Sequence, residues 1–446
     1  MQKVTISLYS GAGGLDFGFE AAGFRTAVAV EMDQRCAETL RENRAKRLIS
    51  KEMQLISDDI TKLLPSDILQ AAQLDSEEAD LLIGGPPCQP FSKSGFWATG
   101  EARRLNDPRA STIESFLLVL ERARPRAFLL ENVEGLGFRG KDEGLQYITK
   151  RLHQVNETWK TEYRPHIAVL NAADFGVPQL RRRLFIVGAR DGRPFVFPKA
   201  THINPSEADG SDDRAHFVTA WEALRDISTP EDVDLKVRGK WADLLPSIPE
   251  GQNYLWHTER GGGEQLFGWR RRYWSFLLKI AKNLPAWTIQ AQPGPATGPF
   301  HWANRRLSIE EMARLQTFPR GAIITGSHAD AQRQIGNAVP SLLAEILARE
   351  ISSQLLGRSL STAPQLAIQR PAGTPPAPEP VGPVASKYLS LRGAHVAHPG
   401  TGRGFRASSR KDAAIAGQKA LDLFLSGSGH GNLAFPNDES FPTEPL

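Results

Sequence analysis

The first 195 residues alternate between short apolar runs and segments with the periodicity of amphipathic helices. Short apolar runs that end in glycine or acidic residues are typical of buried strands in a parallel sheet. Strands that alternate with helices predict a doubly wound, mostly parallel α/β domain, because each helix returns the chain to the edge where the next strand begins. The strands are expected at residues 4–8, 26–30, 53–56, 81–83, 126–130, 166–170 and 184–187.

Residues whose side chains could take part in catalysis or binding follow several of these strands. In open α/β sheets, ligands bind outside the carboxyl ends of the strands, and the run GGPPC would present Cys88 there. A thiol in that position is a candidate nucleophile, although a lone cysteine more often fills an apolar gap. Glu131 follows the strand at 126–130 and resembles a general acid with a raised pKa, the alternative being a helix N-cap. Arg181 and Arg183, two apart where the last strand begins, are expected to point the same way and to bind a phosphate or a base carbonyl.

A nucleotide-type cofactor is indicated by the glycine-rich turn at residues 9–14, between the first strand and the first helix. The turn does not match G-x-G-x-x-G, so a plain tight turn is the alternative. Glu31, about 20 residues after the turn, is positioned to bond ribose hydroxyls. Met32 could lie against an adenine ring, and Asp59 could accept a hydrogen bond from its amino group. Such acidic residues are individually more often helix caps, and it is their repetition at strand ends that favours a cofactor site.

The composition narrows the class of protein. The chain has 446 residues, a net charge of +4 and an isoelectric point of about 9.0, which is compatible with a polyanionic partner but supports one only weakly. Its two cysteines, Cys36 and Cys88, allow no disulfide framework and no zinc cluster, and they fit a reducing compartment. We find no apolar run that could span a bilayer and no secretory signal, so we expect a cytoplasmic protein without a metal site.

Changes in composition divide the rest of the chain. Residues 196–295 lose regular periodicity and predict a second, smaller recognition domain, and residues 296–357 complete the first domain, with a helix capped by Ser308 and Glu311. Residues 358–446 form a Pro/Gly/Ser-rich tail that is expected to be largely disordered and to carry no catalytic residue. Two basic segments could bind a phosphate backbone: the loop after Cys88, and the arginine–aromatic run at 267–274, whose aromatic residues could instead belong to a core.

Six sequence blocks, in this order, resemble the motifs of the cytosine-5 DNA methyltransferases. They are YSGAGGLDFG at residues 9–18, GPPCQPFS at 85–92, ENV at 131–133, QLRRR at 179–183, RLSIEEMARLQTFP at 306–319 and QIGNAVP at 334–340. The departures are small: Tyr9 stands where phenylalanine is usual, and Met32 where an aromatic residue often sits. The resemblance implies the class I methyltransferase (Rossmann-like) fold, S-adenosylmethionine as methyl donor and double-stranded DNA as substrate.

The resemblance also assigns roles to residues of this sequence. The implied catalytic residues are Cys88, Glu131 and Arg183. The implied cofactor-binding residues are Tyr9, Ser10, Gly11, Gly13, Gly14, Leu15, Glu31, Met32, Asp59, Ile60 and Asn337. The implied DNA contacts are Gln89, Ser92, Arg103, Arg104, Arg181, Arg270, Arg271 and Arg272.

The implied reaction begins with addition of the Cys88 thiolate to carbon-6 of cytosine, because carbon-5 alone is too weak a nucleophile. Glu131 would hydrogen-bond ring N3, Arg183 would hold the base carbonyl, and the base would be flipped out of the duplex. An RNA cytosine methyltransferase on the same scaffold is the nearest alternative. A thiol hydrolase would need a histidine near Cys88, and a non-catalytic binding module would be expected to lack Cys88 or Glu131. The recognised DNA sequence and the presence of a cognate restriction endonuclease stay open, and the chain is expected to act as a monomer bound to DNA in the cytoplasm.

Overall fold

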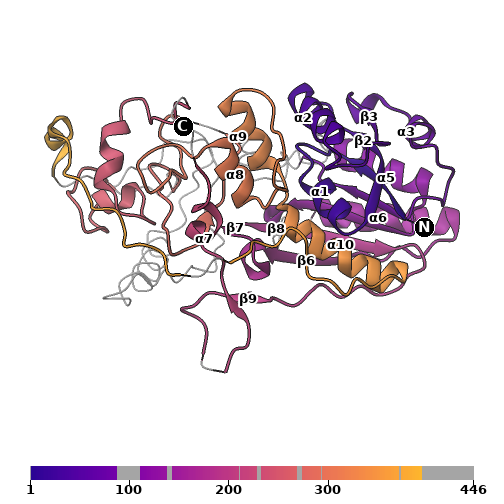
Figure 1. Cartoon of the computed structure of the whole chain (residues 1–446). Helices are drawn as coiled ribbons and strands as arrows, with labels where there is room; N and C mark the ends of the chain where they lie inside the picture. The colour runs from indigo at the N-terminus through magenta and orange to yellow at the C-terminus, as the bar shows by residue number, and fades with distance from the viewer. Residues whose placement is uncertain are drawn as a thin grey trace.

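The structure is a computed structural model that describes residues 2–87, 111–137, 143–209, 211–228, 233–268, 274–292, 294–370 and 373–393. Figure 1 shows a sheet flanked by helices at one end of the molecule and a lobe with little regular structure at the other. Within the described ranges, no helix has both the length and the apolar character needed to cross a bilayer.

A seven-stranded sheet forms the first domain, in the order β3-β2-β1-β4-β5-β8-β6. Each strand expected from the sequence is present, and the sheet is parallel except for β8, which runs antiparallel to both β5 and β6. The doubly wound, mostly parallel α/β prediction is therefore confirmed. The strands are β1 (Lys3–Leu8), β2 (Phe24–Val30), β3 (Gln54–Ile56), β4 (Leu81–Gly84), β5 (Ala127–Val133), β6 (His166–Asn171) and β8 (Arg182–Ala189).

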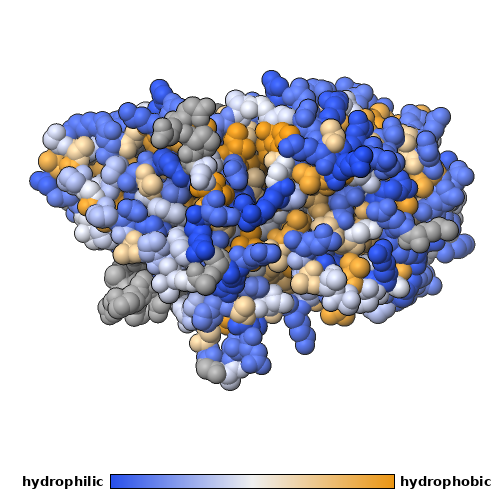
Figure 2. Space-filling model, viewed as in Figure 1, coloured by the Kyte–Doolittle hydropathy of each residue, from blue (hydrophilic) through white to orange (hydrophobic). Residues whose placement is uncertain are grey.

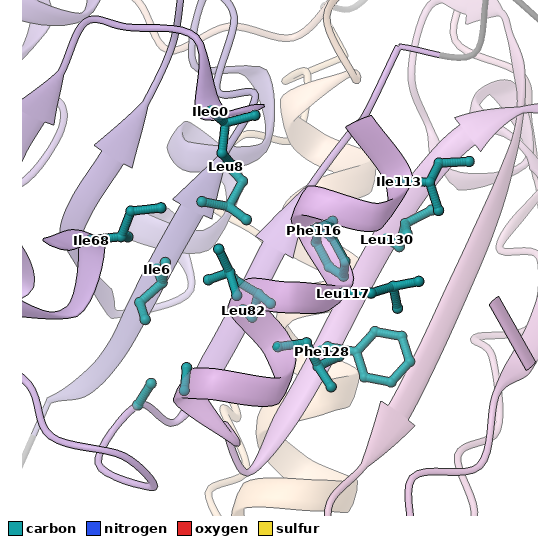
Figure 3. Packing of buried hydrophobic residues seen from close by; sticks show 14 of the residues in the cluster. Ile6, Leu8, Ile60, Ile68, Leu82, Ile113, Phe116, Leu117, Phe128 and Leu130 are labelled. Carbon is teal, nitrogen blue, oxygen red and sulfur yellow. The ribbon is translucent and has the colours of Figure 1, made fainter. Parts of the chain in front are cut away.

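Helices cover both faces of this sheet. One core lies under α3, α5 and α6, where apolar side chains of β1, β4 and β5 pack against α5, as Figure 3 shows for Phe116 and Phe128. The other core lies under α1 and α10. These α-helices, with the others in the described ranges, are α1 (Gly14–Ala21), α2 (Gln34–Ala45), α3 (Pro65–Ala72), α5 (Ser111–Ala123), α6 (Glu143–Trp159), α7 (Ala220–Leu224), α8 (Ile309–Leu315), α9 (His328–Asn337) and α10 (Ser341–Leu356).

The close packing of α1 on α10 joins the N-terminal and C-terminal parts of the first domain. Gly18 makes it possible, because a Cβ there would lie 2.4 Å from the Ala344 Cβ and 2.5 Å from the Ser341 carbonyl oxygen. Real Cβ atoms do not approach so closely, so a larger residue would force the helices apart. The expected return of residues 296–357 to the first domain thus takes the form of α10 packed on α1, and the capping box of Ser308 and Glu311 opens α8 as expected.

Two further cores continue away from the sheet. A central core joins α2 to α7, α8 and α9, and it includes Ile280 and Ile289. A distal core lies within residues 237–268, 274–277 and 294–300, which we call the distal lobe. Its regular structure is confined to short elements such as the 3-10 helices η5 (Ala242–Ser247) and η6 (Tyr254–His257), consistent with the poor periodicity of the sequence. Two short strands, β7 (Gln179–Leu180) and β11 (Ala286–Trp287), pair in parallel and link the central core to the first domain.

The prediction that the chain beyond residue 357 is largely disordered is wrong for residues 358–370 and 373–393. This stretch is extended and ends in the 3-10 helix η7 (Ser386–Leu391), in which Tyr388 is 3% exposed and belongs to the distal core. A proline-rich composition disfavours helices and strands, but it does not prevent an extended segment from packing through its side chains and backbone N–H groups.

A buried carboxyl group lies in the first turn of α1. Asp16 is fully buried, and among the described residues neither of its oxygens has a hydrogen-bond partner of good geometry. Burial raises the pKa of Asp16 to about 7, and the nearby Ser7 hydroxyl opposes this only in part. Asp16 therefore favours the folded state more when it is neutral than when it is ionised.

This pKa predicts a pH-dependent stability. The folded-state pKa lies above the ordinary value of 3.8, so the stabilisation by the neutral form is complete below about pH 4 and is lost as the pH rises through 7. Asp16→Asn stays neutral throughout, and at about 1.4 kcal/mol per pKa unit we expect it to gain about 2–3 kcal/mol on the wild type between pH 5 and pH 8. Urea denaturation at both pH values measures this, with the exposed Asp67→Asn as control. A difference between variant and wild type that does not change with pH would contradict the assignment.

Candidate active site

The segment that carries Cys88 is anchored at both of its ends. The predicted site residues Cys88, Gln89, Ser92, Arg103, Arg104, Arg270, Arg271 and Arg272 lie outside the described residues. Pro86 and Pro87, directly before Cys88, follow the carboxyl end of β4, and α5 begins at Ser111. The described flanks are therefore the turn after β4 on one side and the first turn of the helix α5 on the other.

Three hydrogen bonds hold these flanks together. The Asn132 side-chain amide of β5 donates to the Pro86 carbonyl at 3.1 Å. The Thr112 hydroxyl in the first turn of α5 donates to the Pro87 carbonyl at 3.3 Å, and the Tyr9 hydroxyl donates to the Thr112 carbonyl at 2.6 Å. Tyr9 directly follows β1, so its extra hydroxyl links the glycine-rich turn to Thr112 and, through Thr112, to Pro87. Phenylalanine at this position could not form that bond.

A buried ion pair lies beside this anchor. Glu131 is 9% exposed, and its Oε1 is 3.1 Å from Nε of Arg183 on the neighbouring strand β8. Glu131 is part of β5, which continues to Val133 in register with β8, so it does not cap a helix as the alternative interpretation held. Burial raises the pKa of the Glu131 carboxyl, opposed by the positive charges of Arg183 and Arg181. This group can therefore hold a proton more readily than an ordinary glutamate.

Gly85 provides the space for this carboxyl group. A Cβ at position 85 would lie 2.9 Å from Oε2 of Glu131. The residue that follows β4 must therefore be small for Glu131 to reach the edge of the sheet next to the Pro86-Pro87 turn. Gly85 was not singled out as a site residue from the sequence, although it lies within the GPPC block.

The prediction that Arg181 contacts DNA needs correction. Arg181 is 1% exposed, and its guanidinium donates to the Gly336 carbonyl at 2.6 Å. It precedes β8 and points into the protein, where it lies close enough to Glu131 to affect its pKa. Arg181 therefore connects the QLRRR block to the QIGNAVP block, whereas Arg183 reaches Glu131.

Gln179 of the same block was missed as an organising residue. It is fully buried, and its amide donates to Oε1 of Gln316 at 2.7 Å and accepts from the Ile289 N–H at 3.1 Å. Gln316 in turn donates to the carbonyls of Ile335 and Ala338. Two buried glutamines thus join three sequence blocks, a role that their polar side chains within apolar surroundings could have suggested.

The glycine-rich turn is organised around Glu31. Oε2 of Glu31 accepts from the Gly11 N–H at 2.7 Å, and Oε1 accepts from the Asp33 N–H at 2.7 Å. The Glu31 carboxylate therefore fixes the turn after β1 against the end of β2. Burial raises the pKa of Glu31, and these backbone N–H groups oppose the shift.

The other predicted cofactor residues lie around the same edge. Met32 follows Glu31 and is 63% exposed. Asp59 caps the 3-10 helix η1 (Ile60–Lys62) through Oδ1 alone, and hydrogen bonds from Thr61 lower its pKa. The Ser10 and Ser7 hydroxyl oxygens are hydrogen-bonded at 2.8 Å. Leu15 packs in the core under α10.

Close backbone packing brings the QIGNAVP block to this turn. A Cβ on Gly14 would lie 2.4 Å from the Val339 carbonyl oxygen, so glycine is required for the contact. Gly13 has a φ of 86°, a left-handed conformation that glycine adopts without strain. Asn337 is exposed at the end of α9. It directly precedes Ala338 and Val339, which contact Gly14, so it lies near the turn.

Comparison with known proteins identifies this arrangement. The sequence model of the C-5 cytosine-specific DNA methylase family matches residues 4–353. The chain belongs to this family. The Type II methyltransferase M.SacI of Streptomyces achromogenes is 40% identical over 78% of this chain and 93% of its own. M.AquIA of Picosynechococcus is 46% identical over 47% of this chain and 80% of its own.

Solved structures support the fold of the methyltransferase. A crystal structure described as a putative DNA modification methyltransferase of an Escherichia coli prophage has a TM-score of 0.54, with 21% identity over 79% of this chain and 99% of that chain. A Spodoptera frugiperda DNMT2 mutant has a TM-score of 0.53 with 16% identity, over 78% of this chain and 99% of that chain. The family membership makes the chain a DNA cytosine-5 methyltransferase, which requires a methyl donor and acts on DNA.

The buried pair of Glu131 and Arg183 gives a direct prediction. Glu131→Gln has nearly the same shape but cannot deliver a proton, so we expect single-turnover methylation to slow by about 10²–10⁴-fold with little change in affinity for the methyl donor. For the wild type, the rate should fall as the pH rises through the raised pKa of Glu131, because the protonated form is then lost. Rapid-quench assays across a pH series measure both effects.

Glu134→Gln provides the matched control. Glu134 forms its own ion pair, at 2.9 Å, with Arg182 on β8, one residue from Arg183. The control should therefore retain most of the wild-type rate. Equal losses in the two variants would show that the reaction depends on an ion pair to β8, and not specifically on the proton of Glu131.

Proposed function

We propose that this methyltransferase transfers the methyl group of S-adenosylmethionine to carbon-5 of a flipped-out cytosine within a specific double-stranded DNA sequence, through a covalent adduct of Cys88. The observation that carries this proposal is the Glu131–Arg183 pair next to Gly85. Asn132, the neighbour of Glu131 in β5, donates a hydrogen bond to the Pro86 carbonyl in the turn that precedes Cys88. A proton donor, a cation and the attachment point of a thiol thus meet at the carboxyl ends of β4 and β5.

The residues around the glycine-rich turn fit S-adenosylmethionine. Glu31 uses one hydrogen bond at each oxygen, which leaves lone pairs for ribose hydroxyls. The exposed Met32 offers an apolar surface for an adenine ring, and Oδ2 of Asp59 is not used by its helix-capping bonds. When bound, the cofactor supplies a methyl group activated by a positively charged sulfur.

The reaction follows from the polarity of the cytosine ring. The Cys88 thiolate forms a bond to carbon-6, and the electron pair of the 5,6 double bond makes carbon-5 nucleophilic, with the developing negative charge held at N3 and the base carbonyl. Glu131 hydrogen-bonds N3, and Arg183 holds the carbonyl, so the charge lies against a proton and a guanidinium. After carbon-5 gains the methyl group it loses its proton to a base, the electrons re-form the double bond, and the thiolate leaves.

Access to carbon-6 requires the base to leave the DNA stack. Figure 2 shows hydrophobic side chains gathered in the middle of one face, between the distal lobe and the catalytic domain, whereas the outer ends are mainly hydrophilic.

We propose that residues 196–295 read the DNA sequence. The names of the relatives as Type II methyltransferases support a restriction-modification role, with a cognate endonuclease acting on the same site. We further propose that the enzyme acts as a monomer in the cytoplasm.

The covalent step predicts separate roles for the two cysteines. Cys88→Ser should abolish methyl transfer, because a hydroxyl is a far weaker nucleophile than a thiolate at neutral pH, while DNA binding persists. Cys36→Ala, which removes a buried thiol of α2 and leaves Cys88 in place, should retain activity. Methyl incorporation and gel-shift assays measure the two properties. Full activity of Cys88→Ser would exclude the covalent route.

The substrate is tested by expressing the protein in a host strain that lacks cytosine methylation. Bisulfite sequencing of plasmid DNA should reveal protected cytosines within one recurring short sequence, which also defines the recognition site. Protection without a sequence preference would contradict specific recognition. Protected cytosines in cellular RNA with none in DNA would overturn the DNA assignment.

A further inference from the structure

The chain continues past the catalytic domain as an extended segment that runs the length of the molecule. In Figure 1 it passes from α10 across the front of the protein to the far end of the distal lobe, in orange and then yellow. We call residues 358–370 and 373–393 the C-terminal strap. The family match ends at residue 353, so the strap lies beyond the matched region.

The first anchor of the strap is a buried carboxylate on α10. Glu345 is fully buried, and its two oxygens accept from the backbone N–H groups of Gln365 at 2.7 Å and Leu366 at 2.8 Å, in addition to the Arg349 side chain. The Gln365 side chain also donates to the carbonyl of Ala21 in α1. Without the strap, a buried charge would lose two of its donors, which is a costly change.

The second anchor attaches the strap to the central core. The Arg370 guanidinium donates to both oxygens of Glu222, at 2.8 Å and 3.3 Å, and to the His216 carbonyl at 3.0 Å. Glu222 also closes the capping box of α7 with Thr219. A bidentate contact between an arginine and a carboxylate fixes the relative orientation of the two side chains as well as their distance.

The third anchor lies where three segments meet. The Lys282 ammonium is buried, and it donates to Glu250 of the distal lobe at 2.8 Å, to Glu379 of the strap at 2.8 Å and to the Ala377 carbonyl at 3.0 Å. The Glu379 N–H donates to Glu250 at 2.8 Å. One cation thus ties the distal lobe and the strap together at the border of the central core.

The fourth anchor inserts the strap into the distal core. The Tyr388 ring stacks on Trp241 with centroids 5.6 Å apart and an interplanar angle of 17°, and its hydroxyl donates to the Lys240 carbonyl at 2.6 Å. Ion pairs of Lys387 with Asp243 and of Arg392 with Glu264 flank it. The strap is therefore part of the distal lobe at one end and of the catalytic domain at the other.

We propose that the C-terminal strap positions the distal lobe relative to the catalytic domain, so that both present their surfaces to the same DNA duplex. This inference rests on the proposed function, in which DNA contacts both parts. A lobe held in its binding orientation loses less conformational freedom when DNA binds, and that preorganisation increases affinity. The lobe is also joined to the central core by residues 278–292, which include Ile280 and Ile289 of that core, so the strap sets its orientation and does not provide the sole attachment.

The test is to cut the strap in the folded, full-length enzyme. A protease site inserted between Gly373 and Thr374, which are both exposed, lets the same preparation be measured before and after cleavage with every anchor still present. Cleavage should weaken binding of a short duplex carrying the mapped site by about tenfold, a typical size for coupling between parts of a protein. Small-angle X-ray scattering should show a wider range of distances between lobe and domain, while affinity for S-adenosylhomocysteine stays unchanged.

A second protease site after Gly393 is the matched control, because its cleavage removes residues 394–446 and leaves the strap intact. This control should bind DNA as the uncut enzyme does. Equal loss in the control, or unchanged scattering and DNA affinity after cleavage at Gly373, would overturn the inference. The scattering result does not depend on catalysis, so a failure of the proposed methylation and a failure of the strap are distinguishable.

Discussion

The buried ion pair between Glu131 and Arg183 is the interaction around which the active edge of the sheet is built. Two ionised groups removed from water are costly unless each has partners, so the surrounding structure has to supply them. Antiparallel pairing of β5 with β8 sets Glu131 opposite Phe185, so Arg183, two residues along β8, lies diagonally across from Glu131 on the same face, and Gly85 leaves the volume that the carboxyl group occupies. Asn132, one residue along β5, then holds the turn that leads to Cys88. The chemistry is thus a consequence of where one antiparallel strand enters a parallel sheet.

The second constraint is the closeness of segments that are far apart in the sequence. Gly14 and Gly18 lie on one side of α1, and both meet backbone atoms of residues 338–345. The glycine-rich turn and α1 therefore pack directly on the C-terminal blocks, and Arg181 and Gln179 reinforce this packing through buried hydrogen bonds to the blocks around α8 and α9. Since these buried polar groups find their partners in distant segments, we expect the glycine-rich turn to form cooperatively with the rest of the catalytic domain.

The sequence predicted the sheet well, because apolar runs of strand length ending in glycine or acidic residues are a local signal. It placed the seven strands and the capping box at Ser308, and its motif blocks identified the family. It failed where the outcome depends on tertiary contacts. Arg181 and Arg183 look equivalent in the sequence, yet one binds the Gly336 carbonyl in the interior and the other pairs with Glu131. The proline-rich strap resembles a disordered linker by composition, and its order arises from distant partners such as Glu345 and Trp241. The roles proposed for Cys88 and for the cofactor and DNA contacts stay predictions.

The measurement that tests the central claim most directly is mass spectrometry of the enzyme after reaction with a duplex that carries 5-fluorocytosine at the target position. Fluorine replaces the carbon-5 hydrogen, so no proton is available for the elimination that releases the enzyme. The account predicts a stable adduct joining Cys88 to carbon-6 of a base that already carries the transferred methyl group. Release of methylated product from an ordinary duplex together with no adduct on the fluorinated duplex would contradict the covalent mechanism.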